Sequence, residues 1–563
     1  MEGTQGTKQK RYIFILLLLG VLAVNIKRIF MDFEIDAEYA IAMSYRLATG
    51  DKMFLQMWEP HQTSAFLSAL FIRIYLGLFH TTTGIVVYLN SLGVICKLAV
   101  TGILYRTLKG DVSGRVLGYA CLFFAAVNPK DLALPEFSNM QLWFSALLFC
   151  CLWKYFKQQS RKQWLVLADV CLCLEIISYP SCVIVFGAVV LCIIFFSEKK
   201  WLDLLWTSCT CLFLGGGYIC LFAVPSGLRE FLGRVTQIMA GDGSHNKSIS
   251  VRLFEYGKEA GTFILWSLAF VFTAWILSRL IGKWKKETGR KALLDRFFLL
   301  FAGLVFVVDI MSIAFVAEDY PYLFFYIVIW ILGFVACRSC EETTRRVFLI
   351  GMTISLTGVM ATLILTNLSL YSTLGYGILG VVVSLLCIGE YVEHKKRHLL
   401  RCLIPLFVFV TIFRVGFITK PMNPEPTSIL DVGGIVKSGP AVGMMSTYMG
   451  PYMINTSMEE WQKYIHSGDS LLLVGGEFVH TLGYLYEDTK VAIDSTICTP
   501  TYSDKLLKYW EENPEKYPTV IAVECWYGDL RVPEDHWVLQ WMEDTWHPEE
   551  VIDGAYWRYY IHR

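Results

Sequence analysis

The amino-acid sequence contains fourteen apolar runs, and these limit the folds available to the chain more than any other feature. Most are roughly 16–23 residues long, and a helix that spans the hydrocarbon core of a bilayer needs about 20 apolar residues. The runs are 12–30, 64–79, 84–106, 114–128, 138–156, 163–178, 180–197, 201–223, 261–281, 295–316, 320–337, 347–366, 372–391 and 400–418. They predict an all-α polytopic membrane domain over residues 1–418.

Composition agrees with a membrane-embedded chain. Of 563 residues, 55% are hydrophobic and only 17% are charged, whereas soluble proteins average about 25% charged residues. The first run follows three basic residues, as a secretory signal would, but it lacks a small-residue cleavage site. We therefore interpret it as an uncleaved first helix. Neither half of the chain has the basic patch typical of a nucleic-acid-binding protein.

Basic residues in the short loops predict the orientation, since cytoplasmic loops carry an excess of lysine and arginine. From residue 106 onward, six basic segments are all placed in the cytoplasm: 106–115, 157–162, 199–200, 283–291, 345–346 and 395–401. The loops 129–137, 224–260 and 317–321 and the tail 419–563 then face outside. We expect a multi-pass protein of the cell (plasma) membrane with a cytoplasmic N-terminus.

One apolar run near the start cannot be a full crossing. A cytoplasmic N-terminus places loop 31–63 outside, and Arg106 must lie inside, so only one net crossing separates them. Run 64–79 is short, carries Arg73 in its middle and follows Pro60. We predict a juxtamembrane or re-entrant helix there and thirteen crossings in total, although short tilted helices can also cross.

The tail has a different composition from the membrane part. From Phe417 onward it holds 10 Lys+Arg and 22 Asp+Glu. Residues 471–474 and 518–523 resemble short strands, and 503–513 between them begins with a serine cap followed by helix formers. This alternation predicts a small extracytoplasmic α/β domain with a βαβ-like unit over 419–563.

Acidic residues are densest in the first outside loop, which contains Asp32, Glu34, Asp36 and Glu38. Carboxylates beside a membrane surface are costly unless they are solvated, paired or functional. In one interpretation, one of them is a general base that deprotonates an acceptor hydroxyl, while a neighbour orients it or holds a metal. In the other, they form a solvated edge that enforces topology.

Three segments of this loop carry a family resemblance. They are Ile35-Asp36-Ala37-Glu38-Tyr39-Ala40, Arg46-Leu47-Ala48-Thr49-Gly50-Asp51 and Trp58-Glu59-Pro60-His61-Gln62. Together they resemble the first external loop of GT-C glycosyltransferases, and most closely the bacterial branch related to protein mannosyltransferases and lipid A aminoarabinose transferases (the glycosyltransferase family 39-like branch). The resemblance covers the membrane part well and the tail poorly.

The resemblance implies roles for individual residues. Asp36 corresponds to the catalytic aspartate and Glu38 to its acidic partner, and the two could share a divalent metal ion, which some of these families use. The family places the two acids side by side, whereas here Ala37 separates them. Some relatives have a lysine before the proline stretch. This chain has Glu59 and His61 there. A cation that binds the donor phosphate is therefore either His61 or a residue from another part of the chain.

The other outside loops supply further candidates for binding donor or acceptor. Glu136 and Asn139 lie near the second loop, where an alternative interpretation is a helix cap at Ser138. The third loop, 224–260, follows the seventh crossing, where these families place a large loop that helps form the donor site. His245 and Arg234 are its candidates for a phosphate. Tyr320 lies on a later rim, where aromatic residues more often form an interfacial belt.

The function implied by the resemblance is sugar transfer at the external face. A hexosyl or pentosyl group would move from a polyprenyl-phosphate donor to a glycan, lipid or protein acceptor, with inversion at the anomeric carbon. The alternative is a membrane transporter, or a flippase or polymerase of a surface polysaccharide. Transporters tend to show repeated halves, and the sequence has no internal repeat.

Overall fold

The chain is mostly helical. The computed structural model describes residues 2–158, 161–240, 247–285, 289–314, 320–394, 402–420, 422, 427–475, 481–486, 488–496 and 503–563. The helices before the tail are α1 (Glu2–Met31), α2 (Ile35–Thr49), α3 (Phe66–Phe79), α4 (Ile85–Leu108), α5 (Gly114–Ala126), α6 (Phe137–Lys157), α7 (Gln163–Ser178), α8 (Val185–Phe196), α9 (Lys200–Ser226), α10 (Leu228–Ala240), α11 (Ile249–Trp284), α12 (Arg290–Ala314), α13 (Tyr320–Cys337), α14 (Glu342–Leu365), α15 (Leu370–Leu374), α16 (Ile378–His394) and α17 (Leu403–Phe417).

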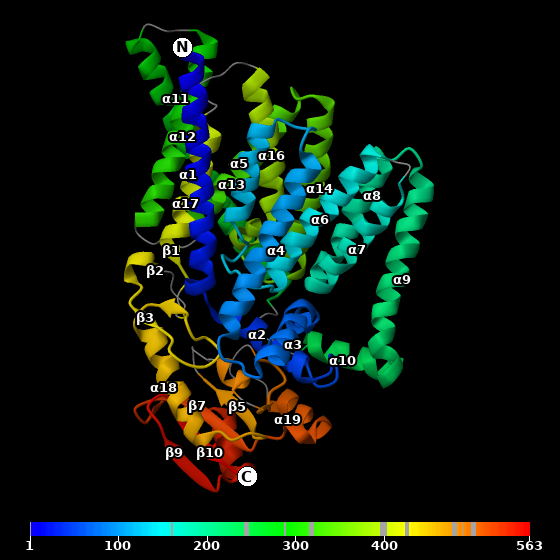
Figure 1. Ribbon diagram of the computed structural model, residues 1–563, viewed down its shortest axis with the longest axis vertical. Coiled ribbons are helices and arrows are strands. Elements are labelled where there is room, and N and C mark those ends of the chain that lie inside the picture. The colour runs from blue at the N-terminus through cyan, green and yellow to red at the C-terminus, as the bar shows by residue number, and fades with distance from the viewer. Residues whose placement is uncertain are drawn as a thin grey trace.

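Every apolar run of the sequence coincides with helical structure in its described residues. Seven helices of the described chain are long and apolar enough to cross a membrane, and other apolar helices are 10–17 residues long. The long helices stand side by side in Figure 1, with the N-terminus at the top and the tail below them. The predicted membrane domain is therefore helical, while the number of thirteen crossings stays a prediction.

Helix α3 lies with α2 and α10 at the lower end of this bundle, next to the tail (Figure 1). Residues 62–79 are long and apolar enough to cross. However, the Arg73 guanidinium donates hydrogen bonds to the carbonyls of Ala48 (3.1 Å) and Leu47 (3.2 Å) at the end of α2. These bonds tie α3 to the first loop, as we expect for a juxtamembrane helix.

The segment 224–260 is largely helical rather than an extended loop. Helix α9 continues to Ser226, α10 follows it, and α11 begins at Ile249, twelve residues before the apolar run predicted at 261. The Ser248 hydroxyl accepts a hydrogen bond from the Val251 amide (3.4 Å) and so caps α11. With 36 residues, α11 is about 54 Å long and exceeds the hydrocarbon core of roughly 30 Å.

The tail forms a small α/β unit. Its strands are β1 (Ile418–Thr419), β2 (Thr427–Ser428), β3 (Gly434–Ile435), β4 (Met445–Ser446), β5 (Ser470–Val474), β6 (Lys490–Val491), β7 (Val520–Trp526), β8 (Asp529–Leu530), β9 (Glu550–Asp553) and β10 (Trp557–Ile561), and its longer helices are α18 (Met449–Tyr464) and α19 (Ser503–Glu512). The main sheet has the order β6-β5-β7-β10-β9. Because β5 and β7 are parallel and α19 lies between them in the chain, the predicted βαβ-like unit is present.

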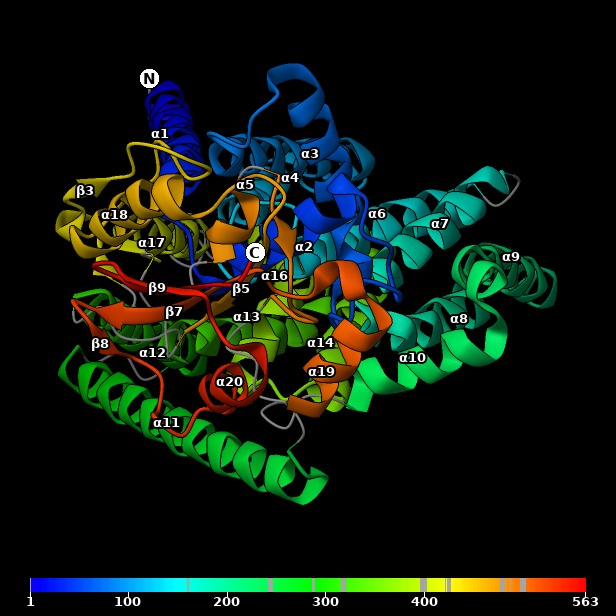
Figure 2. The ribbon, with the colours of Figure 1, turned by 90° about the horizontal axis from the view of Figure 1, so that it is seen from below.

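Two hydrophobic clusters hold these parts together. The first consists of residues from the long helices, including α5, α6, α14 and α16. The second is centred on the tail but also contains α2 and the lower ends of α3 and α4. Seen from below, the tail elements lie across the bundle, with α9 and α11 at its periphery (Figure 2). Apolar side chains of the tail therefore pack in the same cluster as those of the first loop.

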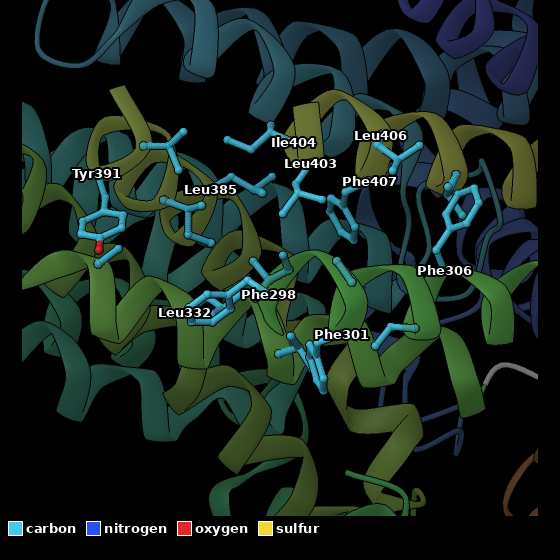
Figure 3. Close-up of a pocket in the computed structure, with 18 of the residues that line it drawn as sticks. Phe298, Phe301, Phe306, Leu332, Leu385, Tyr391, Leu403, Ile404, Leu406 and Phe407 are labelled. Atoms are coloured by element: carbon cyan, nitrogen blue, oxygen red, sulfur yellow. The ribbon is translucent and has the colours of Figure 1, made fainter. Parts of the chain in front are cut away.

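An apolar cavity of about 170 Å³ lies among α12, α13, α16 and α17 (Figure 3). Phe298, Phe301, Leu332 and Phe407 are among the residues that line it, and its polar side chains are Tyr391 and Thr411. The cavity suits a hydrocarbon chain, and the described residues that line it include no carboxylate or cation. The chemistry must therefore be sought elsewhere.

Candidate active site

Helix α2 carries the acids singled out by the sequence. Glu34 is its N-cap residue, and Gly50 ends it with a φ of +122°, which L side chains rarely adopt. Asp36 and Glu38 lie in the first turn. The positive end of the helix dipole stabilises carboxylates there.

The first two acids of the loop are engaged at the junction with the tail. The Asp32 carboxylate forms an ion pair with Lys27 (3.0 Å) and accepts a hydrogen bond from the Lys420 backbone amide (3.0 Å). The Glu34 carboxylate lies 3.3 Å from the Lys420 ammonium. Burial raises the pKa of Glu34, although Lys420 opposes this shift. These acids join α1 to the tail and do not form a solvated edge.

Asp36 is the most exposed of the four acids of this loop. Its side chain is 37% exposed, compared with 21% for Glu34 and 1% for Asp32. Its carboxylate forms a 2.5 Å ion pair with the ammonium of Lys130, from the loop before α6. Burial alone would raise the pKa of Asp36, but Lys130 outweighs it and holds that pKa below its usual value. Asp36 is therefore ionised at neutral pH.

Lys130 connects Asp36 to an aromatic wall. Its ammonium lies 4.3 Å from the ring centroid of Phe137. The imidazole of His61 stacks on Phe137 (4.5 Å between centroids) and on Tyr179 (5.7 Å). Asp36 and Glu136 raise the pKa of Lys130 against the effect of burial. The structure thus brings Asp36, His61 and Glu136 together around one cation.

Glu38 faces a different partner. Side chains two residues apart on a helix do not face each other, and the Glu38 carboxylate accepts a hydrogen bond from the backbone amide of Thr481 (3.1 Å) in the tail. Glu38 is only 4% exposed. The geometry supports an anchoring role for Glu38 and not the role of a second acid that acts beside Asp36.

Glu136 and Asn139 shape the loop that carries Lys130. The Glu136 carboxylate accepts hydrogen bonds from the backbone amides of Ser138 (2.8 Å) and Asn139 (2.6 Å), so Glu136, not Ser138, is the N-cap of α6. The Asn139 side chain donates to the carbonyls of Leu132 (3.0 Å) and Leu134 (2.9 Å). Both residues are almost fully buried and stabilise the loop.

The remaining candidates lie away from Asp36 or outside the description. The Arg234 guanidinium forms ion pairs with Glu230 (3.0 Å) and with Glu512 of the tail (2.8 Å). His245 lies outside the described residues. Tyr320 is the first residue of α13, and its side chain lies outside the description.

A groove of about 820 Å³ opens between α11, α12 and the segment before α15. Lys247, Lys258 and Glu255 line its polar end, while Trp266 and Phe270 line its apolar part. Gly375, which follows α15, lies close to the loop of Lys130, because a Cβ at Gly375 would lie 3.0 Å from the Pro129 carbonyl oxygen. The polar end also contains Glu259, and Lys247 forms an ion pair with Glu255 (3.0 Å), so this end carries both charges beside an apolar body.

In the part of the chain that the structure describes, no group of three or more His, Cys, Asp or Glu side chains could hold a metal ion. The residue that sequence reasoning did not assign is Lys130. A signal for it existed, because Lys130 is a basic residue in a loop that is predicted to face outside, whereas the other short basic loops are predicted to be cytoplasmic.

No known protein family matches the chain, and no curated protein matches it either. Among solved structures, the chain is similar to an oligosaccharyltransferase of Archaeoglobus fulgidus in complex with zinc and sulfate, with 10% identity, a TM-score of 0.46 and coverage of 91% of this chain and 68% of that one. The oligosaccharyltransferase AglB of the same organism, in complex with an inhibitory peptide and a dolichol-phosphate, has 11% identity, a TM-score of 0.43 and coverage of 92% and 70%.

It is also similar to ArnT from Cupriavidus metallidurans. That likeness has 12% identity and a TM-score of 0.42, and it extends over 99% of this chain and 98% of that one. At such identities and scores, the roles of individual residues have to be argued from the chain itself.

Proposed function

We propose that the protein is an integral membrane glycosyltransferase that takes a sugar from a polyprenyl-phosphate donor. The observation that supports this most is the pair of Asp36 and Lys130 at the lower end of the bundle. A carboxylate that is ionised and reachable can accept a proton from an acceptor hydroxyl. An ammonium beside it can bind a phosphate.

The reaction follows from this pair. The donor phosphate binds Lys130 and releases Asp36 from the ion pair. The acceptor oxygen then attacks the anomeric carbon, its proton passes to the Asp36 carboxylate, and the bond between that carbon and the phosphate oxygen breaks. Lys130 stabilises the charge on the departing lipid phosphate. In-line displacement inverts the anomeric carbon, whether the sugar is a hexose or a pentose.

The groove beside α11 fits the lipid part of such a donor. Its apolar part is exposed along the lipid-facing side of α11, where Trp266 is 59% exposed. Lys247 and Lys258 lie at its polar end together with Glu255 and Glu259, so a donor phosphate there would compete with these carboxylates for the lysines. Loop 224–260 would then contribute to donor binding, as the sequence predicts, with His245 as a further candidate.

The orientation belongs to the same proposal. Loops 31–63 and 129–137, which carry Asp36 and Lys130, would face outside, as would the tail, and the N-terminus would be cytoplasmic. Acceptors at that face are cell-surface glycans, lipids or proteins.

The test is transfer by the purified full-length chain in nanodiscs, with a panel of polyprenyl-phosphate hexoses and pentoses as donors. Asp36→Asn keeps the shape of the side chain but removes the proton acceptor, so we expect transfer to fall about 10²–10⁴-fold. Binding of polyprenyl phosphate should persist. Asp529→Asn, at an exposed tail position, is the matched control and should transfer at the parental rate. Parental transfer by Asp36→Asn would remove the central residue and favour a transporter.

A further inference from the structure

The helix that carries Asp36 packs against α3 and against the tail. Ala37, Ile41 and Tyr45 of α2 belong to the same hydrophobic cluster as Leu482 and Tyr509 of the tail. All five are buried. The apolar face of α2 is thus completed by a part of the chain more than 400 residues away.

Polar contacts repeat this connection at both ends of α2. In the first turn, Glu38 accepts a hydrogen bond from the amide of Thr481 (3.1 Å). In the last turn, the Arg46 guanidinium donates a hydrogen bond to the hydroxyl of Tyr509 (3.0 Å). Just beyond the helix, Asp51 forms a 2.5 Å ion pair with Lys516.

Arg46 is the centre of these contacts. Its fully buried guanidinium pairs with Asp51 (2.9 Å) and with Glu59, and it also donates to the carbonyl of Gln56. Burial raises the pKa of Glu59 to about 7, against the effect of Arg46. The Tyr509 hydroxyl donates to the same Gln56 carbonyl (2.9 Å). A buried cation with this many acceptors fixes α2, loop 50–59 and α19 in one arrangement.

We infer that contacts from the tail fix the position of α2 on the side away from α3, and that Arg46 is a positioning residue which holds Asp36 in register with Lys130. The role in catalysis rests on the proposed function, whereas the packing of α2 does not. The tail is then part of the catalytic unit and not a separate appendage. Contacts from the tail to the first loop would determine where the base lies relative to the donor.

Hydrogen exchange of the full chain in nanodiscs tests the packing without any substrate. Tyr509→Phe removes a hydroxyl bonded to both Arg46 and Gln56. We expect exchange in residues 35–49 to rise about tenfold together with exchange in 503–512, while α4 stays unchanged. Tyr517→Phe is the matched control, because Tyr517 lies in the same unit but is 40% exposed. Unchanged exchange in 35–49 with Tyr509→Phe would overturn the inference.

Kinetics test the positioning role. We expect Tyr509→Phe to lower kcat about tenfold, and Arg46→Met more strongly, with little change in the KM for the lipid donor. A purely structural role would instead reduce the amount of folded protein and leave kcat per folded molecule unchanged. That outcome would refute positioning by Arg46. If the parental chain transfers no sugar at all, the proposed function fails, but the exchange experiment still decides whether the tail holds α2 in place.

Discussion

At the scale of single residues, the site depends on how four acids in one short loop are distributed. Asp32 and Glu34 pair with Lys27 and Lys420, and Glu38 binds a tail amide. Asp36 alone of the four pairs with Lys130 and keeps a side chain more than one third exposed. Three of the four acids thus anchor the loop, and Asp36 is the candidate base.

The pH dependence of transfer should reveal the effect of Lys130 on Asp36. Lys130 holds the pKa of Asp36 below its usual value although burial acts to raise it. Lys130→Met removes the cation and leaves the burial, so the pKa of Asp36 rises. A base works only when deprotonated, and the acidic limb of the pH–rate profile should therefore move to higher pH. Lys130→Arg keeps the charge and should leave the limb in place; an unmoved limb in Lys130→Met would argue against Asp36 as the base.

The two acids of α2 should respond differently to amide substitution. Glu38→Gln keeps an oxygen that can accept the hydrogen bond from Thr481, so we expect transfer to fall less than about tenfold. Asp36→Asn should lose far more. Assays of the two variants side by side check this, and equal losses would instead indicate that both acids act in one metal or proton-transfer centre.

At the scale of elements, helix α4 and the loop before α6 meet without room for a side chain. A Cβ at Gly93 would lie 1.8 Å from the carbonyl oxygen of Ala133. Gly93→Ala should force this loop, and Lys130 with it, away from α4 at a cost of about 1–3 kcal/mol. Gly102→Ala on the same helix meets nothing within 4 Å and is the control. Thermal unfolding in detergent and transfer assays measure both, and equal behaviour of the two variants would contradict the close approach.

Sequence reasoning located the helices well because apolar length is a local property. It did not find the cap of α6, because Ser138 and Glu136 are both plausible caps and the choice depends on where the chain turns. The early start of α11 was missed because residues 249–260 are amphipathic and carry no continuous apolar run.

At the scale of the whole molecule, orientation is the prediction to test first. A cysteine in place of Tyr527, which is 74% exposed in the tail, should be labelled by an impermeant reagent added to intact cells. A cysteine at Lys283, in a predicted cytoplasmic loop, should be labelled only after permeabilisation. The reverse pattern would invert the topology and place Asp36 on the wrong face for an external donor.

The assembly of the site could not be predicted from the sequence. Lys130 meets Asp36 across 94 residues, and Tyr509 meets Arg46 across 463. No local pattern indicates such pairs, because they depend on how helices and tail pack. A charge count could assign each loop to a side of the membrane, but it could not show which cation of that side reaches the acid.

The separation between Arg46 and Tyr509 also has a consequence for synthesis. A ribosome adds about 5–20 residues per second, so α2 emerges roughly 25–90 s before its partner on α19 exists. During this interval the apolar face of α2 lacks its final cover. Until the last hundred residues have been synthesised, the lipid surface or a chaperone has to cover that face and so prevent aggregation. Premature termination between residues 418 and 509 should therefore yield chains whose membrane helices insert but whose first loop lacks its contacts with α19.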